Sequence, residues 1–158
     1  MPVAVHKGQG MQIHVSQVPE EGLKEHASYD PSSLDMERED IRLPEPFEVD
    51  ADINKVDEQL VVRAAIHCPL RMICGRCLEE FNAAVTPRAI FSYTVRTTDV
   101  VDITDDVRQE IILAYPMIPL CSPGCKGLCV ACGQNLNHGS CAHQAAPDAG
   151  PAPDRGGR

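Results

Sequence analysis

The residues of this chain that are best suited to chemistry are cysteines and histidines in its C-terminal third. Residues 116–143 hold five of the eight cysteines, Cys121, Cys125, Cys129, Cys132 and Cys141, with His138 and His143 beside them. Their spacing lets neighbouring thiolates converge on one tetrahedral ion, and the intervening glycines permit the tight backbone reversals that this requires. So polar a segment cannot form a hydrophobic core, and we predict a structural zinc site here.

A second pair of thiols, in Cys74-Gly-Arg-Cys77, leaves three ligand arrangements open. The first joins the two C-x-x-C pairs, Cys74, Cys77, Cys129 and Cys132. The second is confined to the tail and takes four ligands from Cys121, Cys125, Cys129, Cys132, Cys141 and His143. The third has two ions, one held by Cys74, Cys77, Cys121 and Cys125 and the other by Cys129, Cys132, Cys141 and His143.

We favour the arrangement confined to the tail, with one ion. The 51 residues between Cys77 and Cys129 far exceed the separation of about 15–20 that is usual in a zinc ribbon. Cys129 and Cys132 have the form of a zinc knuckle, Cys-Val-Ala-Cys-Gly, and they belong to the expected ligands together with the other tail cysteines. Cys74, Cys77 and His143 are additional candidates.

The cysteine count has a second interpretation, because eight cysteines in a secreted chain would suggest disulfides. The first residues, Met-Pro-Val-Ala-Val-His-Lys, do not have the form of a signal peptide. No apolar run approaches the ~18 residues of a membrane span. We therefore expect the protein in the reducing cytoplasm, where clustered cysteines more often bind metal.

The formal net charge of −9 is unevenly distributed. Residues 1–60 hold 14 acidic and 5 basic side chains, whereas residues 61–158 hold 9 of each. Within residues 61–96, five arginines face only Glu79 and Glu80. A local basic face is therefore compatible with the sequence, but a global attraction to nucleic acid is not. The candidate RNA-binding residues are Arg63, Arg71 and Arg76.

Hydrophobic alternation predicts the elements that must position these residues. Residues 11–15, 47–54 and 60–68 alternate with the two-residue period of half-buried strands, and the last two form a hairpin. Pro69 is expected to interrupt the ladder. Further strands are expected over 70–73, 78–85 and 89–95, and Cys68 is expected to be a small buried core residue.

A helix is expected over residues 105–115, capped by Thr104 and stopped by Pro116, with Val107 and Ile111 on its buried stripe. The predicted fold is therefore α+β: a mainly antiparallel sheet or small barrel with one packed C-terminal helix, followed by a cysteine-rich zinc module. The expected organisation is a flexible N-terminus at 1–10, a β-rich domain at 11–115 with an acidic connector at about 24–46, the zinc module at 116–143 and a disordered tail at 144–158.

Three segments carry a resemblance to a known family. They are Cys-Gly-Arg-Cys-Leu-Glu-Glu-Phe at 74–81, Val-Arg-Gln-Glu-Ile-Ile-Leu-Ala-Tyr-Pro at 107–116 and Cys-Lys-Gly-Leu-Cys-Val-Ala-Cys-Gly-Gln-Asn-Leu-Asn at 125–137. Together and in this order they resemble the bacterial YceD family, the large ribosomal RNA subunit accumulation proteins, over roughly residues 11–143. The chain departs from a frequent tail pattern of this family by having Cys-Ala-His at 141–143, which makes His143 a candidate substitute ligand.

This resemblance implies a non-catalytic factor that supports synthesis, processing or accumulation of the large-subunit ribosomal RNA. The expected partners are that RNA or its precursor particle, and basic ribosomal proteins, with no membrane and no small-molecule substrate. The alternative is a thiol-disulfide oxidoreductase or redox sensor that uses Cys74 and Cys77, although Glu79 and Glu80 would oppose thiolate formation there. A zinc deaminase or protease is excluded, because neither His-x-Glu with Pro-Cys-x-x-Cys nor His-Glu-x-x-His occurs.

Overall fold

A computed structural model describes residues 4–7 and 10–143 of the chain. The strands are β1 (Ala4–Lys7), β2 (Gln12–His14), β3 (Leu23–Tyr29), β4 (Ile41–Arg42), β5 (Phe47–Val56), β6 (Gln59–Ile73), β7 (Glu80–Val85), β8 (Arg88–Thr94) and β9 (Val100–Asp102). Two short 3-10 helices, η1 (Val15–Gln17) and η2 (Pro31–Ser33), and the α-helix α1 (Thr104–Leu113) complete the described elements. No described helix is long and apolar enough to span a membrane.

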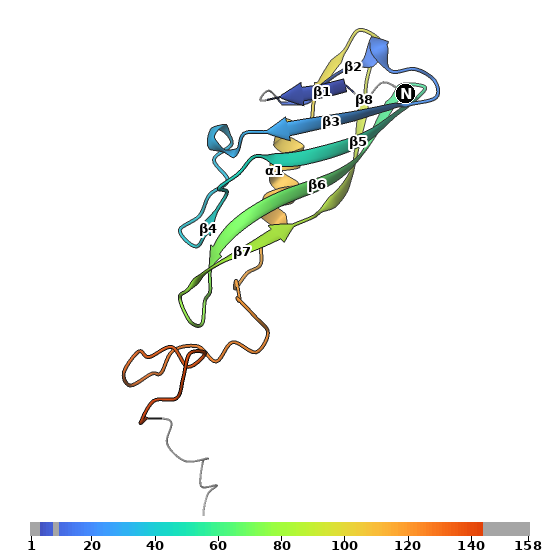
Figure 1. Cartoon of the computed structure of the whole chain (residues 1–158). Coiled ribbons are helices and arrows are strands. Elements are labelled where there is room, and N and C mark those ends of the chain that lie inside the picture. Colours follow the sequence, from blue (N-terminus) through green and yellow to red (C-terminus); the bar gives the residue numbers. More distant parts are fainter. Residues whose placement is uncertain (1–3, 8–9, 144–158) are drawn as a thin grey trace, which may run out of the picture.

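Seven strands form one sheet in the order β1-β3-β5-β6-β4, with β7 and β8 also paired to β6. Its pairs are antiparallel except for β1 with β3. A separate antiparallel pair joins β2 to β9. Figure 1 shows α1 lying across one face of the sheet and the cysteine segment beyond one end of it. The predicted α+β fold, a mainly antiparallel sheet with one C-terminal helix followed by a cysteine-rich segment, is confirmed for the described residues.

The β5–β6 hairpin carries much of the core, as its alternation predicts. In β6, the side chains at even positions from Leu60 to Met72 are buried, and those at odd positions are exposed or half-buried. The facing residues of β5 include Phe47, which is fully buried and stacked on Tyr29 with ring centroids 5.1 Å apart. Burial of one face of each strand removes apolar surface from water, which is the main favourable contribution to folding.

Pro69 does not interrupt β6, contrary to the expectation. On one edge, the pairing of β6 with β5 ends at His67 and the pairing with β4 begins at Arg71. Pro69 lies in this gap, where no neighbouring strand needs the N–H that proline lacks. On the other edge, it stays in register opposite Ala84. The strand therefore continues to Ile73.

β7 and β8 lie end to end along the second edge of β6. The register does not shift between them, because Ile73 pairs with Glu80 and Gln59 pairs with Thr94. The two strands and β6 thus form one long hairpin whose closed end is the Cys74–Cys77 turn. In Figure 1, this end of the hairpin points toward the cysteine segment.

The acidic connector expected at about 24–46 is instead partly strand. β3 pairs with β5 along its whole length, and Ala27 and Tyr29 are buried. The alternation in β3 was hidden because its buried face includes Glu25 and its other face carries polar residues. Residues 4–7 of the N-terminus, expected to be flexible, form β1, whereas the tail expected to be disordered at 144–158 lies outside the described residues.

The predicted helix is present, but its capping residue is different. Thr104 is the first residue of α1 rather than its cap, and its backbone N–H donates to Asp102 Oδ1 at 2.9 Å. Val107 and Ile111 are buried, as the stripe predicts. Tyr115 follows the helix and donates its hydroxyl to the Met36 carbonyl oxygen at 3.0 Å. This contact fixes the point at which the chain leaves the sheet for the cysteine segment.

Candidate metal centres

The two C-x-x-C turns share one backbone geometry. In the first, Leu78 N–H donates to the Cys74 carbonyl at 2.9 Å, and Cys74 N–H donates to the Glu79 carbonyl at 2.9 Å. In the second, Gly133 N–H donates to the Cys129 carbonyl at 2.8 Å, and Cys129 N–H donates to the Gln134 carbonyl at 2.8 Å. Each turn therefore directs two thiols to the same side, which is the geometry that a tetrahedral metal requires.

The residue that follows each turn has a left-handed backbone. Leu78 has a φ of 61° and Gly133 a φ of 74°. Glycine accepts this conformation without a steric penalty, whereas a side chain with a Cβ does not. Leu78 is 64% exposed, so its side chain offers little packing energy in return. The first turn therefore carries backbone strain that the second avoids.

Exchanging the residue types at these two positions is expected to have opposite effects. Leu78→Gly should strengthen metal binding, because it removes the steric cost of a left-handed backbone at a residue with a Cβ. That cost is about 1 kcal/mol, which corresponds to a roughly fivefold change in affinity. Gly133→Ala should weaken binding at the second turn by a similar factor. Competition with a calibrated zinc chelator measures both. An equal change of the same sign in both variants would contradict this account.

The first turn meets two tail cysteines. The ligand atoms of Cys74, Cys77, Cys121 and Cys125 all lie within 4.8 Å of one another. Sγ of Cys74 is 3.8 Å from Sγ of Cys125, and Sγ of Cys77 is 3.7 Å from Sγ of Cys121. A regular tetrahedron with Zn–S distances of about 2.3 Å has edges of about 3.8 Å. The thiols are thus spaced for a shared ion and too far apart for disulfides, whose sulfur atoms lie about 2.05 Å apart.

Backbone contacts hold the tail against this turn. Gly75 N–H donates to the Pro119 carbonyl at 2.8 Å, and Arg76 Nη1 donates to the Cys125 carbonyl at 3.2 Å. A Cβ at Gly75 would lie 2.9 Å from Ile118 Cγ2, so a larger residue would displace the Ile118 side chain. The two thiol pairs are therefore positioned by peptide contacts as well as by any bound ion.

The second turn forms a separate group with the end of the described chain. The ligand atoms of Cys129, Cys132, Cys141 and His143 also lie within 4.8 Å of one another. An antiparallel bridge between Leu128 and Asn135 closes the loop around the first two ligands. Three thiols and one imidazole form one of the usual tetrahedral zinc ligand sets.

The structure therefore groups the candidate ligands as in the third of the three arrangements, and not as in the preferred arrangement confined to the tail. Cys121 and Cys125 lie with Cys74 and Cys77, and His143 completes the other group. Cys74 and Cys77 are far from Cys121 and Cys125 in sequence, but their turn lies at the end of the β6–β7 hairpin, next to the tail. Cys68 is in neither group, and it is fully buried in the core as expected.

The electrostatics of the sulfur atoms also favour a bound cation. Burial opposes ionisation of Cys74, but the backbone N–H groups of Cys77, Cys121 and Arg76 together lower the pKa of its thiol to about 6. Near Cys77, the Glu79 N–H favours the thiolate, but desolvation and the neighbouring thiols prevail and raise the pKa of Cys77 to about 12. Four thiolates can share this site only when a cation offsets their repulsion.

A side-chain amide that sequence reasoning missed contacts the first group. Asn137 Nδ2 donates to Cys125 Sγ at 3.3 Å, and its Oδ1 accepts from Lys126 N–H at 2.8 Å. Nearby, His138 Nε2 lies 2.6 Å from Glu79 Oε1. Hydrogen bonds to ligating sulfur orient the ligand and tune the metal site. The only signal in the sequence was the Asn-Leu-Asn run after the second turn.

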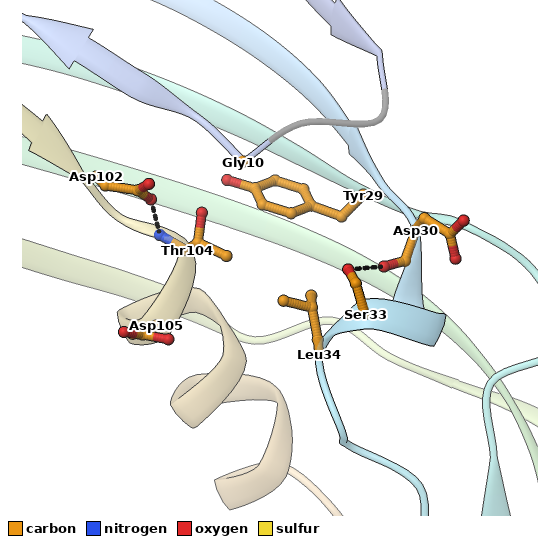
Figure 2. Close-up of a pocket in the computed structure, with 8 residues that line it drawn as sticks. All are labelled: Gly10, Tyr29, Asp30, Ser33, Leu34, Asp102, Thr104 and Asp105. Carbon is orange, nitrogen blue, oxygen red and sulfur yellow. Dashed lines mark hydrogen bonds between the residues drawn. The ribbon is translucent and has the colours of Figure 1, made fainter.

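A hollow of about 380 Å³ lies where the start of α1 faces the end of β3 (Figure 2). Its lining includes three carboxylates, those of Asp30, Asp102 and Asp105. Asp102 accepts from Thr104 N–H, and Ser33 Oγ donates to the Asp30 carbonyl at 3.2 Å. These contacts stabilise local turns, and the acidic lining makes the hollow unsuited to anionic ligands.

Comparison with protein families identifies part of the chain. Residues 90–152 match the model of the large ribosomal RNA subunit accumulation protein YceD. A chloroplastic YceD homologue of Zea mays, named as a large ribosomal RNA subunit accumulation protein, is 46% identical over 37 residues, covering 23% of this chain and 13% of that protein. The resemblance to the YceD family is confirmed.

Longer matches to two mycobacterial proteins carry no functional name. An uncharacterised protein of Mycobacterium leprae is 31% identical over 107 residues, covering 58% of this chain and 49% of that protein. An uncharacterised protein of Mycobacterium tuberculosis is 32% identical over 106 residues, covering 57% and 51%. The chain therefore spans about half the length of these relatives. No solved structure shows significant similarity to it.

Proposed function

We propose that this protein is a non-catalytic ribosome biogenesis factor that supports synthesis, processing or accumulation of the large-subunit ribosomal RNA. The observation that carries the proposal is the match of residues 90–152 to the YceD family model. The maize relative, which is named as a large ribosomal RNA subunit accumulation protein, supports the same role. The proposed partners are the large-subunit RNA or its precursor particle, together with basic ribosomal proteins, in the cytoplasm of a bacterium.

We further propose that both cysteine groups bind zinc. Soft thiolates and imidazole are preferred zinc ligands, and the 3.7 and 3.8 Å sulfur separations fit a tetrahedral ion. Four protein ligands at each ion leave no position for a water molecule, which supports a structural role. The ions would hold the tail in a defined shape beyond the end of the sheet.

Thiol-disulfide exchange is the less supported function for Cys74 and Cys77. The lowered pKa of Cys74 suits an attacking thiolate. However, Cys74 is fully buried, and an attacking thiol must be accessible to its substrate. Its backbone N–H contacts equally favour a metal ligand.

Deleting the gene in its native host is expected to lower the ratio of large-subunit to small-subunit ribosomal RNA. A plasmid copy of the wild-type protein should restore this ratio, and so should Cys68→Ala, since Cys68 lies outside both metal groups. The double variant Cys74→Ser/Cys77→Ser should fail to restore it. The measurement is quantitative electrophoresis of total RNA. An unchanged ratio in the deletion strain would refute the proposed role.

A further inference from the structure

The face of the sheet opposite α1 carries four exposed arginines, which we call the arginine face. They are Arg42 of β4, Arg63 and Arg71 of β6, and Arg88 of β8. Arg42 and Arg71 are directly opposite each other in the β4–β6 pair. Like charges in this position destabilise a sheet. Such a pairing is unfavourable for folding alone, so it points to an anionic partner that lies across both strands.

The acidic residues on the neighbouring strand form their ion pairs with other partners than these arginines. Of the three exposed carboxylates of β5, that of Glu48 lies opposite His67 and those of Asp50 and Asp52 turn toward β3. Asp52 Oδ1 lies 3.2 Å from Lys24 Nζ, although Asp52 is directly opposite Arg63 in the β5–β6 pair, and Asp50 Oδ1 lies 2.7 Å from His26 Nδ1. Among the residues that the structure describes, none of the four arginines has a carboxylate within salt-bridge distance. The four guanidinium groups of the arginine face are therefore available to an anionic partner.

The arginine face is too long for one small anion to contact all four arginines. Arg63 and Arg71 are eight residues apart on β6, which corresponds to about 27 Å along a strand. Between Arg63 and Arg88, a hollow of about 430 Å³ is lined by small side chains, including Ala65 and Ala89, and on the β5 side by Asp50 and Asp52. Arg88 is directly opposite Ala65, so a phosphate chain can approach its guanidinium group from the side of the hollow away from the two carboxylates. The matching ligand is a polyanion.

The described residues of the arginine face include no aromatic side chain, which favours a double-stranded over a single-stranded nucleic acid as the ligand. The aromatic residues of β7 and β8, Phe81, Phe91 and Tyr93, are half-buried and pack against the core on the other side. Proteins that bind single strands usually stack bases on aromatic side chains. Double-stranded RNA is instead recognised through its shape, its phosphates and its 2′-hydroxyl groups.

We propose that the arginine face binds the backbone of double-helical RNA. The inference rests on the proposed function and specifies the surface and the kind of RNA involved. Two of its residues, Arg63 and Arg71, belong to the RNA-binding candidates found in the sequence. Arg76 does not belong to the arginine face, because its guanidinium donates to the carbonyl oxygen of Cys125, one of the four cysteines grouped with Cys74. Arg42 and Arg88 are the new RNA-binding candidates.

Binding of a fluorescent 20-base-pair RNA duplex to the zinc-loaded full-length protein tests this proposal. The double variant Arg71→Glu/Arg88→Glu should bind at least about tenfold more weakly at 0.1 M salt, since each lost phosphate contact contributes roughly eightfold there. Arg96→Glu/Lys55→Glu is the matched control, because it makes the same charge change at residues outside the arginine face. The control should bind with nearly wild-type affinity.

Folding provides a second readout. Arg71→Glu places a carboxylate opposite Arg42, so the thermal midpoint should stay the same or rise while RNA binding falls. The proposal is overturned if the wild-type protein does not bind the duplex, if the control loses as much affinity as the double variant, or if single-stranded RNA binds more tightly. Binding of only a basic ribosomal protein would also overturn it.

The deletion strain separates this inference from the proposed function. If the wild-type copy restores large-subunit RNA and Arg71→Glu/Arg88→Glu does not, both are supported. If both copies restore it, the proposed function stands and the arginine face is irrelevant to it. If the wild-type copy restores nothing, the proposed function itself fails.

Discussion

Replacing Cys74 and Cys77 with serine is expected to reduce bound zinc from about two ions to about one per chain, because these residues supply half of the first metal group. A structural zinc contributes of order 10–16 kcal/mol of binding energy in small peptides at neutral pH. The tail that contains Cys121 and Cys125 should therefore lose its fixed position. Native mass spectrometry measures the metal content.

Trypsin provides the structural measurement for the same variant. Lys126 is the only basic residue other than histidine between 116 and 143, and its N–H is bonded to Asn137 in the folded tail. Cleavage after Lys126 should be slow in the wild type and in Cys68→Ala, and fast in the double serine variant. Retention of two ions or of protease resistance after the double substitution would contradict the assignment of the first group.

Phe47→Ala is expected to destabilise the sheet by about 3–5 kcal/mol. Phe47 is fully buried, and its ring stacks on Tyr29. The Tyr29 hydroxyl in turn accepts from Met11 N–H at 2.9 Å, so the cavity would weaken the attachment of the N-terminal segment as well. Urea unfolding followed by circular dichroism gives the change in the free energy of unfolding.

Leu113→Ala is the control for this prediction. Leu113 is 70% exposed at the end of α1, so its truncation should change the stability by no more than about 0.5 kcal/mol. Similar losses in the two variants would show that Phe47 does not have the central role in the core that its burial indicates.

The sequence predicted the elements whose alternation is strongly apolar, and it failed where alternation was concealed. β5 and β6 were evident from Val, Ile and Leu at every second position. β3 was not, because only Ala27 and Tyr29 mark its buried face clearly and a charged residue, Glu25, shares that face. Composition suggested a connector where pairing with β5 in fact imposes a strand.

The candidate ligands were predicted as a set, and their grouping was one of the three arrangements left open, but it was not the arrangement that we preferred. Cysteine spacing reports which neighbours along the chain can share an ion. It does not report that β6 continues past Pro69 and carries Cys74 to a position 3.8 Å from Cys125, which is 51 residues away. Asn137 was missed for the same reason, since its contact with Cys125 exists only in the folded loop. Tertiary geometry decides both.

An ion held by the first metal group would close a ring of about fifty residues that contains β7, β8, β9 and α1. By the chain-entropy relation for cross-links, a ring of that size removes about 4 kcal/mol of conformational freedom from the unfolded chain. The metal would then act on the whole second half of the domain, including segments that it does not touch. The zinc concentration in the cell would thereby affect the stability of the sheet against unfolding as well as the shape of the tail.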